Sequence, residues 1–541
     1  MVNPSTELAL DISKSMLSCG VTDVVVCPGS RSAPLAWQMA QLASQGKINL
    51  HTRIDEREAG FLALGIAKAT KRPVPVVATS GTAVANLLPA VVEAHHSGIP
   101  LVVLSADRPA AVRGNSAPQT TNQVGIFNSF VKAQVDTAVP TSEILDAIKS
   151  SLISHPGPVH INAQFDMPLM PDDPEIEFGD VNQIQIAEEP QQKLNLELPS
   201  KGLLVIGDLP DGTHVQELID LAQDCGYPII WEPTAQVLRS ENTISHGALL
   251  LQSGKLPKPE VVISAGLIGL SRPVLNVLKE APQHFAIHLP ATGAQLPNPV
   301  LSAKQILSTV PVVSTSVDKT WLATWQQASL VASEVITKKL NLETLTGPSA
   351  AITLWNYVPA KSSLFISSSW SARHIESYAS ARADISTFGN RGVNGIDGLI
   401  STAIGVALTQ PNRTYLLIGD IAYLHGVGGL NISAANKNPN LTVVVLDNDG
   451  SGIFSQLEQG AAKYQKHFER IFGTPHGKDL WVIAESLGVP ATRVTTKSEL
   501  VKALRLSDQI PGMHVVVCST GSRENEQELI AQISAEVISS I

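Results

Sequence analysis

The sequence predicts an α/β protein made of three consecutive domains with mainly parallel sheets. Short runs rich in β-branched residues alternate with longer helical patterns along the whole chain, as in parallel sheets with crossover helices. The strand runs are continuously apolar rather than alternating, which is typical of strands covered on both faces. The length of 541 residues fits about three or four domains of roughly 100–200 residues each.

The first domain is predicted at residues 1–180, where strand and helix patterns alternate most regularly. Its expected elements are helices at 4–18, 33–43, 56–70 and 84–95 and strands at 21–27, 48–54, 73–79, 100–106 and 158–163. A polar stretch at about 172–201, rich in Pro, Asp, Glu and Gln, then breaks the pattern. This composition predicts a linker.

The middle domain is predicted at 195–345 and the third at 350–541. The middle domain has expected strands at 203–206, 228–231, 261–265 and 284–288, helices at 215–225 and 273–279, and a helical connection at 319–348. The third has expected strands at 364–368, 414–418, 441–446 and 514–518, with helices at 371–379, 399–408 and 524–541. The α/β pattern therefore occurs three times.

Composition excludes several classes of protein. The apolar fraction is 44% and the charged fraction 16%, which supplies several cores and argues against long disordered stretches. The net charge of −10, with scattered Lys and Arg, argues against nucleic acid or an anionic membrane as partner. No window holds about 18 uninterrupted apolar residues, so no membrane span is expected.

The cellular location is predicted from the cysteines and the first residues of the sequence. Four cysteines stand far apart with no CxxC pair, which is neither a disulfide framework nor a zinc site. The start MVNPSTELALDISKSM contains acids and lacks the basic, then apolar, pattern of a signal peptide. We therefore expect a cytoplasmic protein.

The ends of two expected strands carry oxygen ligands. Gly419 and Asp420 follow the strand TYLLI, and Asn448 follows LTVVVL 28 residues after Asp420. That spacing is about one strand–helix–strand unit, so the two side chains can meet at one sheet edge, where such sheets bind ligands. Carboxylate and amide oxygens suit Mg²⁺, and Gly419 permits close approach of a diphosphate to a helix N-terminus. The alternative is an ordinary helix cap at Asp420 and a turn at DNDG.

The first domain offers a second set of polar residues. Glu56 opens a helix within RIDERE, where it is either a cap or a carboxylate for a ring nitrogen. The loops CPGSRS and SGTAVANL are turns of small residues between strand and helix, which suit ligand approach but are also common in α/β loops. Arg31, between two serines at a strand end, offers a planar fork for a carboxylate.

Together these segments resemble the thiamine-diphosphate enzymes of the pyruvate-decarboxylase-like type. Within that group, CPGSRSAPL, IDEREAGFLALGIAKA, SGTAVANLLPAVVEA, SADRP, GNRGVNGIDGLISTA and GDIAYLH with DNDGSGIF resemble the 2-succinyl-5-enolpyruvyl-6-hydroxy-3-cyclohexene-1-carboxylate synthases of the menaquinone pathway. The match is dense in the first and third domains and thin in the middle one. SRSAPL combined with NRGxxGIDG is specific to these synthases.

The resemblance implies a reaction and a set of roles. Thiamine diphosphate, held through Mg²⁺ or Mn²⁺, would serve to decarboxylate 2-oxoglutarate and to add the remaining four-carbon unit to isochorismate. Glu56 would bond the pyrimidine N1′ and so activate the thiazolium C2. The metal ligands would be Asp420, Asn448 and the carbonyl of Gly450; further cofactor contacts would be Ser369, Gly419, Ile421, Ile453, Phe454 and Leu457. The catalytic and substrate-binding residues would be Ser30, Arg31, Gln119, Arg373 and Arg391.

The chain departs from the pattern at two places. Some relatives have a Lys-Arg pair where Ser271-Arg272 stands here, so only Arg272 supplies charge for a substrate at that point. GDI replaces the GDG of the wider group, which keeps the aspartate. The resemblance also implies active sites shared between subunits of a homodimer or homotetramer, since Glu56 and Asp420 lie on different domains.

Alternative functions stay open at this point. One is another thiamine-diphosphate enzyme, such as an acetolactate-synthase-like or oxalyl-type decarboxylase, although the arginine set favours substrates with more than one carboxylate. Another is a non-catalytic scaffold, which the combination of Glu56, Asp420 and Asn448 disfavours. A nicotinamide oxidoreductase is disfavoured because no strand is followed by GxGxxG. The sequence leaves open dimer against tetramer, the preferred metal, and menaquinone against phylloquinone as the pathway's product.

Overall fold

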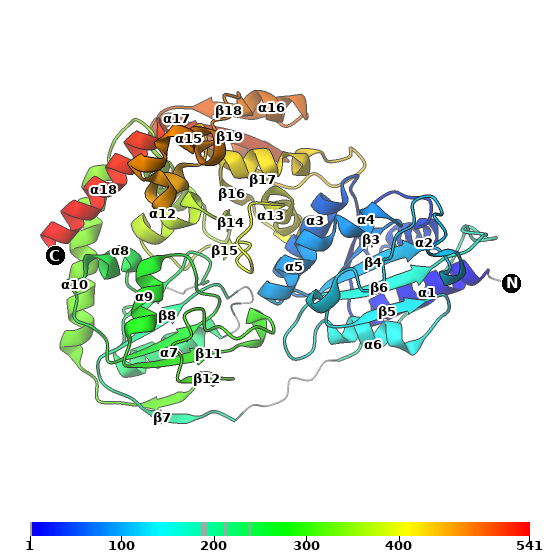
Figure 1. The fold of residues 1–541 in the computed structure, drawn as a ribbon, viewed down its shortest axis with the longest axis horizontal. Coiled ribbons are helices and arrows are strands. Elements are labelled where there is room, and N and C mark those ends of the chain that lie inside the picture. The colour runs from blue at the N-terminus through cyan, green and yellow to red at the C-terminus, as the bar shows by residue number, and fades with distance from the viewer. Residues whose placement is uncertain (1–2, 186–191, 210–211, 213, 237–239) are drawn as a thin grey trace.

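The computed structural model describes residues 3–185, 192–209, 212, 214–236 and 240–541. It confirms the α/β fold class: the described chain contains three large sheets, and every strand pair within them is parallel. Figure 1 shows the first domain to one side of the other two, which lie one above the other. Each large sheet lies within one predicted domain range, and the boundaries between those ranges stay a prediction.

The first sheet has six strands in the order β2-β1-β3-β4-β6-β5. The strands are β1 (Asp23–Val26), β2 (Asn49–Thr52), β3 (Val74–Ala78), β4 (Leu101–Asp107), β5 (Gln134–Thr137) and β6 (Val159–Gln164). The helices are α1 (Pro4–Ser18), α2 (Ala33–Ser44), α3 (Glu56–Thr70), α4 (Thr82–Ala85), α5 (Leu88–Ser97) and α6 (Ser142–Ser150). Side chains of α1, α2 and α6 form the core on one face, and those of α3, α4 and α5 form it on the other.

The middle sheet has five strands in the order β12-β11-β10-β8-β9. They are β8 (Gly202–Ile206), β9 (Ile229–Trp231), β10 (Val261–Ala265), β11 (Gln283–Ile287) and β12 (Gln305–Leu307); β7 (Asn195–Glu197) and β13 (Val312–Ser314) form a separate pair. The helices are α7 (Val215–Cys225), α8 (Gly247–Ser253), α9 (Arg272–Glu280) and the long α10 (Lys319–Leu340).

The third sheet has six strands in the order β15-β14-β16-β17-β19-β18. They are β14 (Ser363–Ile366), β15 (Ser386–Phe388), β16 (Thr414–Gly419), β17 (Leu441–Asp447), β18 (Ala491–Val494) and β19 (Met513–Ser519). The helices are α11 (Gly347–Tyr357), α12 (Trp370–Tyr378), α13 (Leu399–Thr409), α14 (Asp420–His425), α15 (Gln465–Phe468), α16 (Leu480–Ser486), α17 (Lys497–Gln509) and α18 (Arg523–Ser540).

One predicted helix is wrong. The sequence predicts a single helix at 84–95, but the structure has α4 and α5, with Asn86 and Leu87 between them. Pro89 stands in the first turn of α5, where its missing N–H costs nothing, whereas inside a continuous helix it would remove a hydrogen bond. The alternation also failed to predict several short elements, notably β5, α6, α8, β15 and β18.

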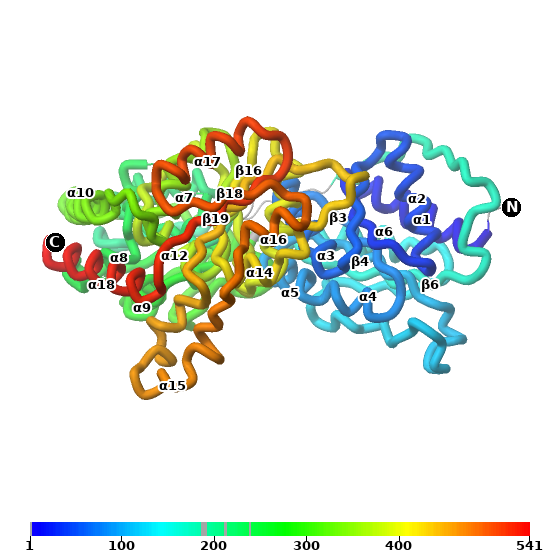
Figure 2. Tube along the Cα trace, turned by 90° about the horizontal axis from the view of Figure 1, so that it is seen from above, coloured from blue at the N-terminus to red at the C-terminus, as the bar shows by residue number. Residues whose placement is uncertain are grey.

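Helices α3 and α13 join the first and third domains at very close range. A Cβ atom built on Gly65 would lie 2.1 Å from the carbonyl oxygen of Thr402, and one on Gly405 would lie 2.3 Å from that of Leu62. The crossing therefore requires glycine on both helices. Residues of both domains form one continuous core here, and both views show α3 beside the third domain (Figures 1 and 2).

A segment between β17 and α16 projects from the third domain. Figure 2 shows the part around α15 standing away from the body of the molecule. It exposes large apolar side chains: Leu457 is 42% exposed, Tyr464 43% and Ile471 58%. As for membranes, no helix in the described residues is long and apolar enough to span one.

Candidate active site

The two strand ends singled out by the sequence lie side by side. Strands β16 and β17 pair in parallel with Gly419 opposite Leu446, so Asp420 and Asn448 leave the sheet at the same edge. The Asp420 carboxylate is buried and accepts the N–H groups of Ile421 at 2.6 Å, Asn448 at 3.2 Å and Gly450 at 2.8 Å. This side chain therefore organises the loop as a cap does, while its position also suits metal binding.

Asn448 points one unpartnered oxygen into this edge. Its amide nitrogen donates to Glu526 Oε2 at 3.1 Å, and Glu526 Oε1 bonds His374 Nε2 at 2.8 Å. These bonds fix the amide orientation, yet the buried Oδ1 has no hydrogen-bond partner among the described residues. A buried carbonyl oxygen without a donor needs another ligand, and a divalent cation supplies one. The donor set therefore fits Mg²⁺ or Mn²⁺.

Gly450 completes the loop in a conformation reserved for glycine. Its φ is +137°, and a Cβ atom there would lie 2.3 Å from the carbonyl oxygen of Gly473. The carbonyl oxygen of Gly450, predicted as a metal ligand, accepts the N–H of Gly452 at 3.1 Å. A carbonyl has two lone pairs, so this bond leaves one for a cation.

Two residues at this edge were not predicted from the sequence. His476 Nε2 lies 3.5 Å from Asp420 Oδ2 and 3.3 Å from Asp447 Oδ1, and the three side chains can reach one common ligand position. Burial and the neighbouring Asp420 charge raise the pKa of Asp447, and the Asp420 carboxylate facing His476 raises the pKa of His476. Asp447 is the last residue of a strand, so its place at this edge could have been predicted from the sequence. The place of His476 could not, because a long irregular segment separates it from that strand.

The other predicted cofactor contacts surround the same edge. Ser369, with φ of +71°, precedes the first turn of α12. Ile453 and Phe454 lie half-buried in the turn after the DNDG loop, and Phe454 packs against Phe472 at 5.8 Å between ring centroids. Leu457 is exposed. Ile453, Phe454 and Leu457 thus form an apolar wall, and its Leu457 end is exposed to solvent in the single chain.

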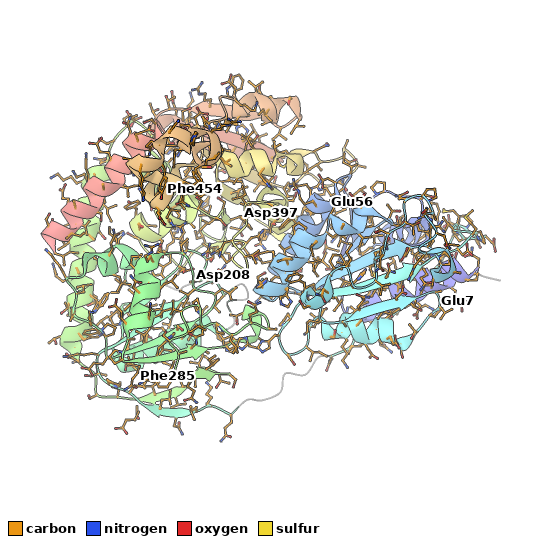
Figure 3. All side chains as sticks on the ribbon, viewed as in Figure 1. Glu7, Glu56, Asp208, Phe285, Asp397 and Phe454 are labelled. Atoms are coloured by element: carbon orange, nitrogen blue, oxygen red, sulfur yellow. The ribbon has the colours of Figure 1, made fainter. Side chains whose placement is uncertain are left out.

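Glu56 lies in a different place. It begins α3, which Asp55 caps by accepting the N–H groups of Arg57 and Glu58. Its side chain is half-buried and makes no hydrogen bond to any described residue. Figure 3 shows Glu56 on the first domain, well apart from Phe454 on the third. The carboxylate and this part of the apolar wall are therefore separated within one chain.

The predicted residues of the first domain other than Glu56 lie near Arg108. Arg108 Nη1 donates to the Gln119 carbonyl at 2.7 Å and to Ser80 Oγ at 3.0 Å. Arg31 donates to the Phe165 carbonyl at 2.8 Å, and burial together with the Arg108 charge lowers its pKa. Ser30 is exposed beside it. Arg108 is thus a second cation beside Arg31, and it lies within the SADRP motif although the sequence did not predict it as a site residue.

Arg373 and Arg391 lie at the junction of the middle and third domains. Arg391 is 7% exposed, and its Nη2 lies 3.5 Å from Glu232 Oε2. Arg373 Nη2 donates to the Leu270 carbonyl at 2.9 Å. Arg272, at the start of α9, is exposed. Arg373 therefore reaches the segment in which serine replaces the expected lysine.

This fold and this edge define a thiamine-diphosphate enzyme. Residues 7–126 match the family model described as the thiamine pyrophosphate enzyme, N-terminal TPP binding domain, and residues 367–518 match the C-terminal TPP binding domain. The first range contains Glu56, and the second contains Asp420 and Asn448. The expected class of cofactor is thereby confirmed.

The particular family follows from similarity over nearly the full length. The chain is 38% identical to the 2-succinyl-5-enolpyruvyl-6-hydroxy-3-cyclohexene-1-carboxylate synthase of Thermobifida fusca, covering 93% of this chain and 94% of that one. It is 37% identical to the synthase of the same name from Saccharopolyspora erythraea, with 95% of each chain covered. For Lysinibacillus sphaericus the identity is 34%, over 98% of each chain. The chain belongs to this family of synthases.

Proposed function

We propose that this protein decarboxylates 2-oxoglutarate with thiamine diphosphate and adds the four-carbon unit to isochorismate. The products would be 2-succinyl-5-enolpyruvyl-6-hydroxy-3-cyclohexene-1-carboxylate and CO₂, as a step of menaquinone biosynthesis. One structural observation carries the cofactor part: the buried, unpartnered Oδ1 of Asn448 beside the Asp420 carboxylate. Family membership carries the reaction.

Three groups of the third domain would hold the cofactor. Asp420, Asn448 Oδ1 and the Gly450 carbonyl would bind Mg²⁺ or Mn²⁺, and the metal would neutralise the diphosphate. Thiamine diphosphate would supply the electron sink for decarboxylation and carbon–carbon bond formation. Ser369, Gly419, Ile421, Ile453, Phe454 and Leu457 would line the rest of its site.

Glu56 would hold a proton at the pyrimidine N1′. A half-buried carboxylate without a hydrogen-bond partner among the described residues is available for such a contact. Because Glu56 and Phe454 are apart in one chain (Figure 3), we propose that Glu56 of one subunit completes the site of another. The projecting segment with exposed Leu457, Tyr464 and Ile471 supports a homodimer as the minimal active unit. A tetramer and a cytoplasmic location stay predictions.

The cations would receive the carboxylates of the two substrates. Arg373 and Arg391 are buried or half-buried at one junction, and Arg272 stands on the adjacent segment. Arg31, Ser30 and Gln119 form a second polar group on the first domain, with Arg108 beside them. Arginine binds a carboxylate through two parallel N–H groups, which fixes both position and orientation.

The test is a reaction of the purified protein with 2-oxoglutarate, isochorismate, thiamine diphosphate and Mg²⁺, followed by mass spectrometry. A product carrying a succinyl unit, formed only with the cofactor present, would support the proposal. Release of CO₂ from 2-oxoglutarate without that product would overturn the acceptor. Pyruvate consumption instead would favour an acetolactate-synthase-like enzyme, and no consumption of any 2-oxo acid would favour a scaffold.

Glu56→Gln tests the assigned proton position. The amide has the shape of the carboxylate but cannot exchange the proton, so the variant should fold and bind the cofactor while turnover falls at least about a hundredfold, the lower end of acid–base contributions. Circular dichroism and cofactor binding serve as controls. Normal turnover by this variant would remove Glu56 from the mechanism.

A further inference from the structure

Arg391 lies on a loop that two other domains hold in place. From the first domain, Lys68 donates to the carbonyl of Gly389, and the Glu93 carboxylate accepts the N–H groups of the two residues after Arg391, each at 2.9 Å. Both Lys68 and Glu93 are only 2% exposed. A buried charged group costs free energy unless it keeps its hydrogen-bond partners. Any other loop conformation would break the bonds of Lys68 and Glu93, so these two residues hold the loop in one conformation.

Glu232 holds the same loop from the middle domain. It follows β9, is 1% exposed, and uses its two carboxylate oxygens for different partners. Oε1 accepts the N–H groups of Gly269 and Leu270, each at 2.8 Å. Oε2 faces Arg391 Nη2 at 3.5 Å. One carboxylate therefore links Arg391 to the segment 269–272.

The segment 269–272 is also tied to α12. Arg373 donates to the Leu270 carbonyl at 2.9 Å, and Ser271 Oγ donates to Glu376 Oε1 at 3.0 Å. Arg272 follows directly. Glu232 thus stands at the centre of a set of contacts that places the guanidinium groups of Arg373 and Arg391 near one another and beside the segment that carries Arg272.

We propose that Glu232 is a positioning residue for substrate binding, because it fixes Arg391 and the segment 269–272 relative to each other. The inference rests on the proposed function, in which these cations receive substrate carboxylates. Glu232 itself touches no substrate in this scheme. Figure 3 places Asp208, the neighbouring acid of the middle domain, near the junction of all three domains, consistent with this location.

The geometry favours positioning over a purely structural ion pair. The 3.5 Å separation exceeds hydrogen-bond distance, and the Arg391 side chain donates no hydrogen bond to any residue in the described ranges. Glu232 therefore stabilises the charge and location of Arg391 without consuming its N–H donors. The N–H groups of Arg391 that make no hydrogen bond among the described residues are therefore available to a substrate carboxylate, which provides two oxygens.

A double-mutant cycle tests the proposal. Glu232→Gln keeps the shape and the oxygen that accepts from Gly269 and Leu270 but removes the charge opposite Arg391. Steady-state KM and kcat for 2-oxoglutarate and isochorismate would be measured for the wild type, Glu232→Gln, Arg391→Gln and the double variant, all as holoenzyme. We expect Glu232→Gln to change KM for at least one substrate by about threefold or more, and this change to vanish in the Arg391→Gln background.

Each outcome decides the matter. A KM within twofold of wild type for both substrates, or a change that persists in full in the Arg391→Gln background, would overturn the positioning role. An inactive wild type would instead overturn the proposed function. Asp23→Asn is the matched control, because Asp23 is also a buried carboxylate, pairs with His51 at 3.0 Å, and lies in the first domain. Its effect should be on stability and should leave both KM values unchanged.

Discussion

Replacing Asp420 by alanine should destabilise the protein even when no metal is present. The carboxylate accepts the N–H groups of Asn448 at 3.2 Å and Gly450 at 2.8 Å in a site where Asp420 is 3% exposed. Alanine leaves both donors without an acceptor. A buried unsatisfied donor costs about 1–3 kcal/mol, so the two together cost about 2–6 kcal/mol.

The assay is thermal unfolding of the apoprotein in EDTA, which removes metal binding from the comparison. For a domain of about 150–250 residues, 1 kcal/mol shifts Tm by about 2–4 °C, so Asp420→Ala should lower Tm by at least about 4 °C. Asp420→Asn is the matched variant: its amide oxygen still accepts one N–H group, so its loss of Tm should be smaller.

Addition of Mg²⁺ and thiamine diphosphate then separates the two roles of the carboxylate. Ligand binding to the native state raises Tm, so the wild type should gain stability and both variants should gain much less. An unchanged Tm for Asp420→Ala in EDTA would refute the reasoning, since the loop would then be held without the carboxylate. Equal stabilisation of wild type and variants by Mg²⁺ and the cofactor would remove Asp420 from the metal site.

Three further predictions concern the domain junctions. Gly405→Ala gains about 1 kcal/mol of helix propensity but places a Cβ atom 2.3 Å from the Leu62 carbonyl. Because overpacking typically costs about 1–3 kcal/mol, Tm should stay equal or fall, and a rise in Tm would contradict the close helix crossing. Burial is the chief cause that raises the folded-state pKa of Glu376 from 4.5 to about 8. Because the folded state then holds this proton more tightly than the unfolded state, the contribution of Glu376 to stability is full below about pH 4.5 and is lost as pH rises to about 8. Glu376→Gln, which stays neutral, should therefore gain Tm relative to wild type between pH 5 and 8.5, and a pH-independent difference would contradict the raised pKa. Burial and the stacked His288 ring, 4.2 Å away, lower the pKa of His155 below 6.5, so its contribution to stability is full above about pH 6.5 and falls as pH drops. The hydrogen-exchange protection factors of residues 151–157, which correct for the intrinsic pH dependence of exchange, should therefore be lower at pH 5.5 than at 7.5, and His155→Gln should abolish that difference.

Local patterns in the sequence were enough for much of the fold. Continuously apolar strands alternating with helical runs predicted three α/β domains, and α3, α7 and β10 begin and end where the patterns do. The same local logic brought Asp420 and Asn448 together, because the carboxyl ends of neighbouring parallel strands share one edge. Motif resemblance then supplied the family, which the full-length relatives confirm.

What the sequence alone did not decide is the set of partners around each site residue. Local sequence does not predict that Glu232 faces Arg391 or that Glu376 accepts a hydrogen bond from Ser271. Nor does it predict that His476 faces Asp420. Each of these pairs joins separate elements or separate domains. Nor does local pattern predict that Glu56 stands apart from the apolar wall at Phe454. Periodicity reports which face of an element is buried, whereas the contacts of a buried charge depend on how whole domains pack. The fold class and most of the longer elements were therefore determined by the sequence, whereas the electrostatic surroundings of the site were decided only by the tertiary structure.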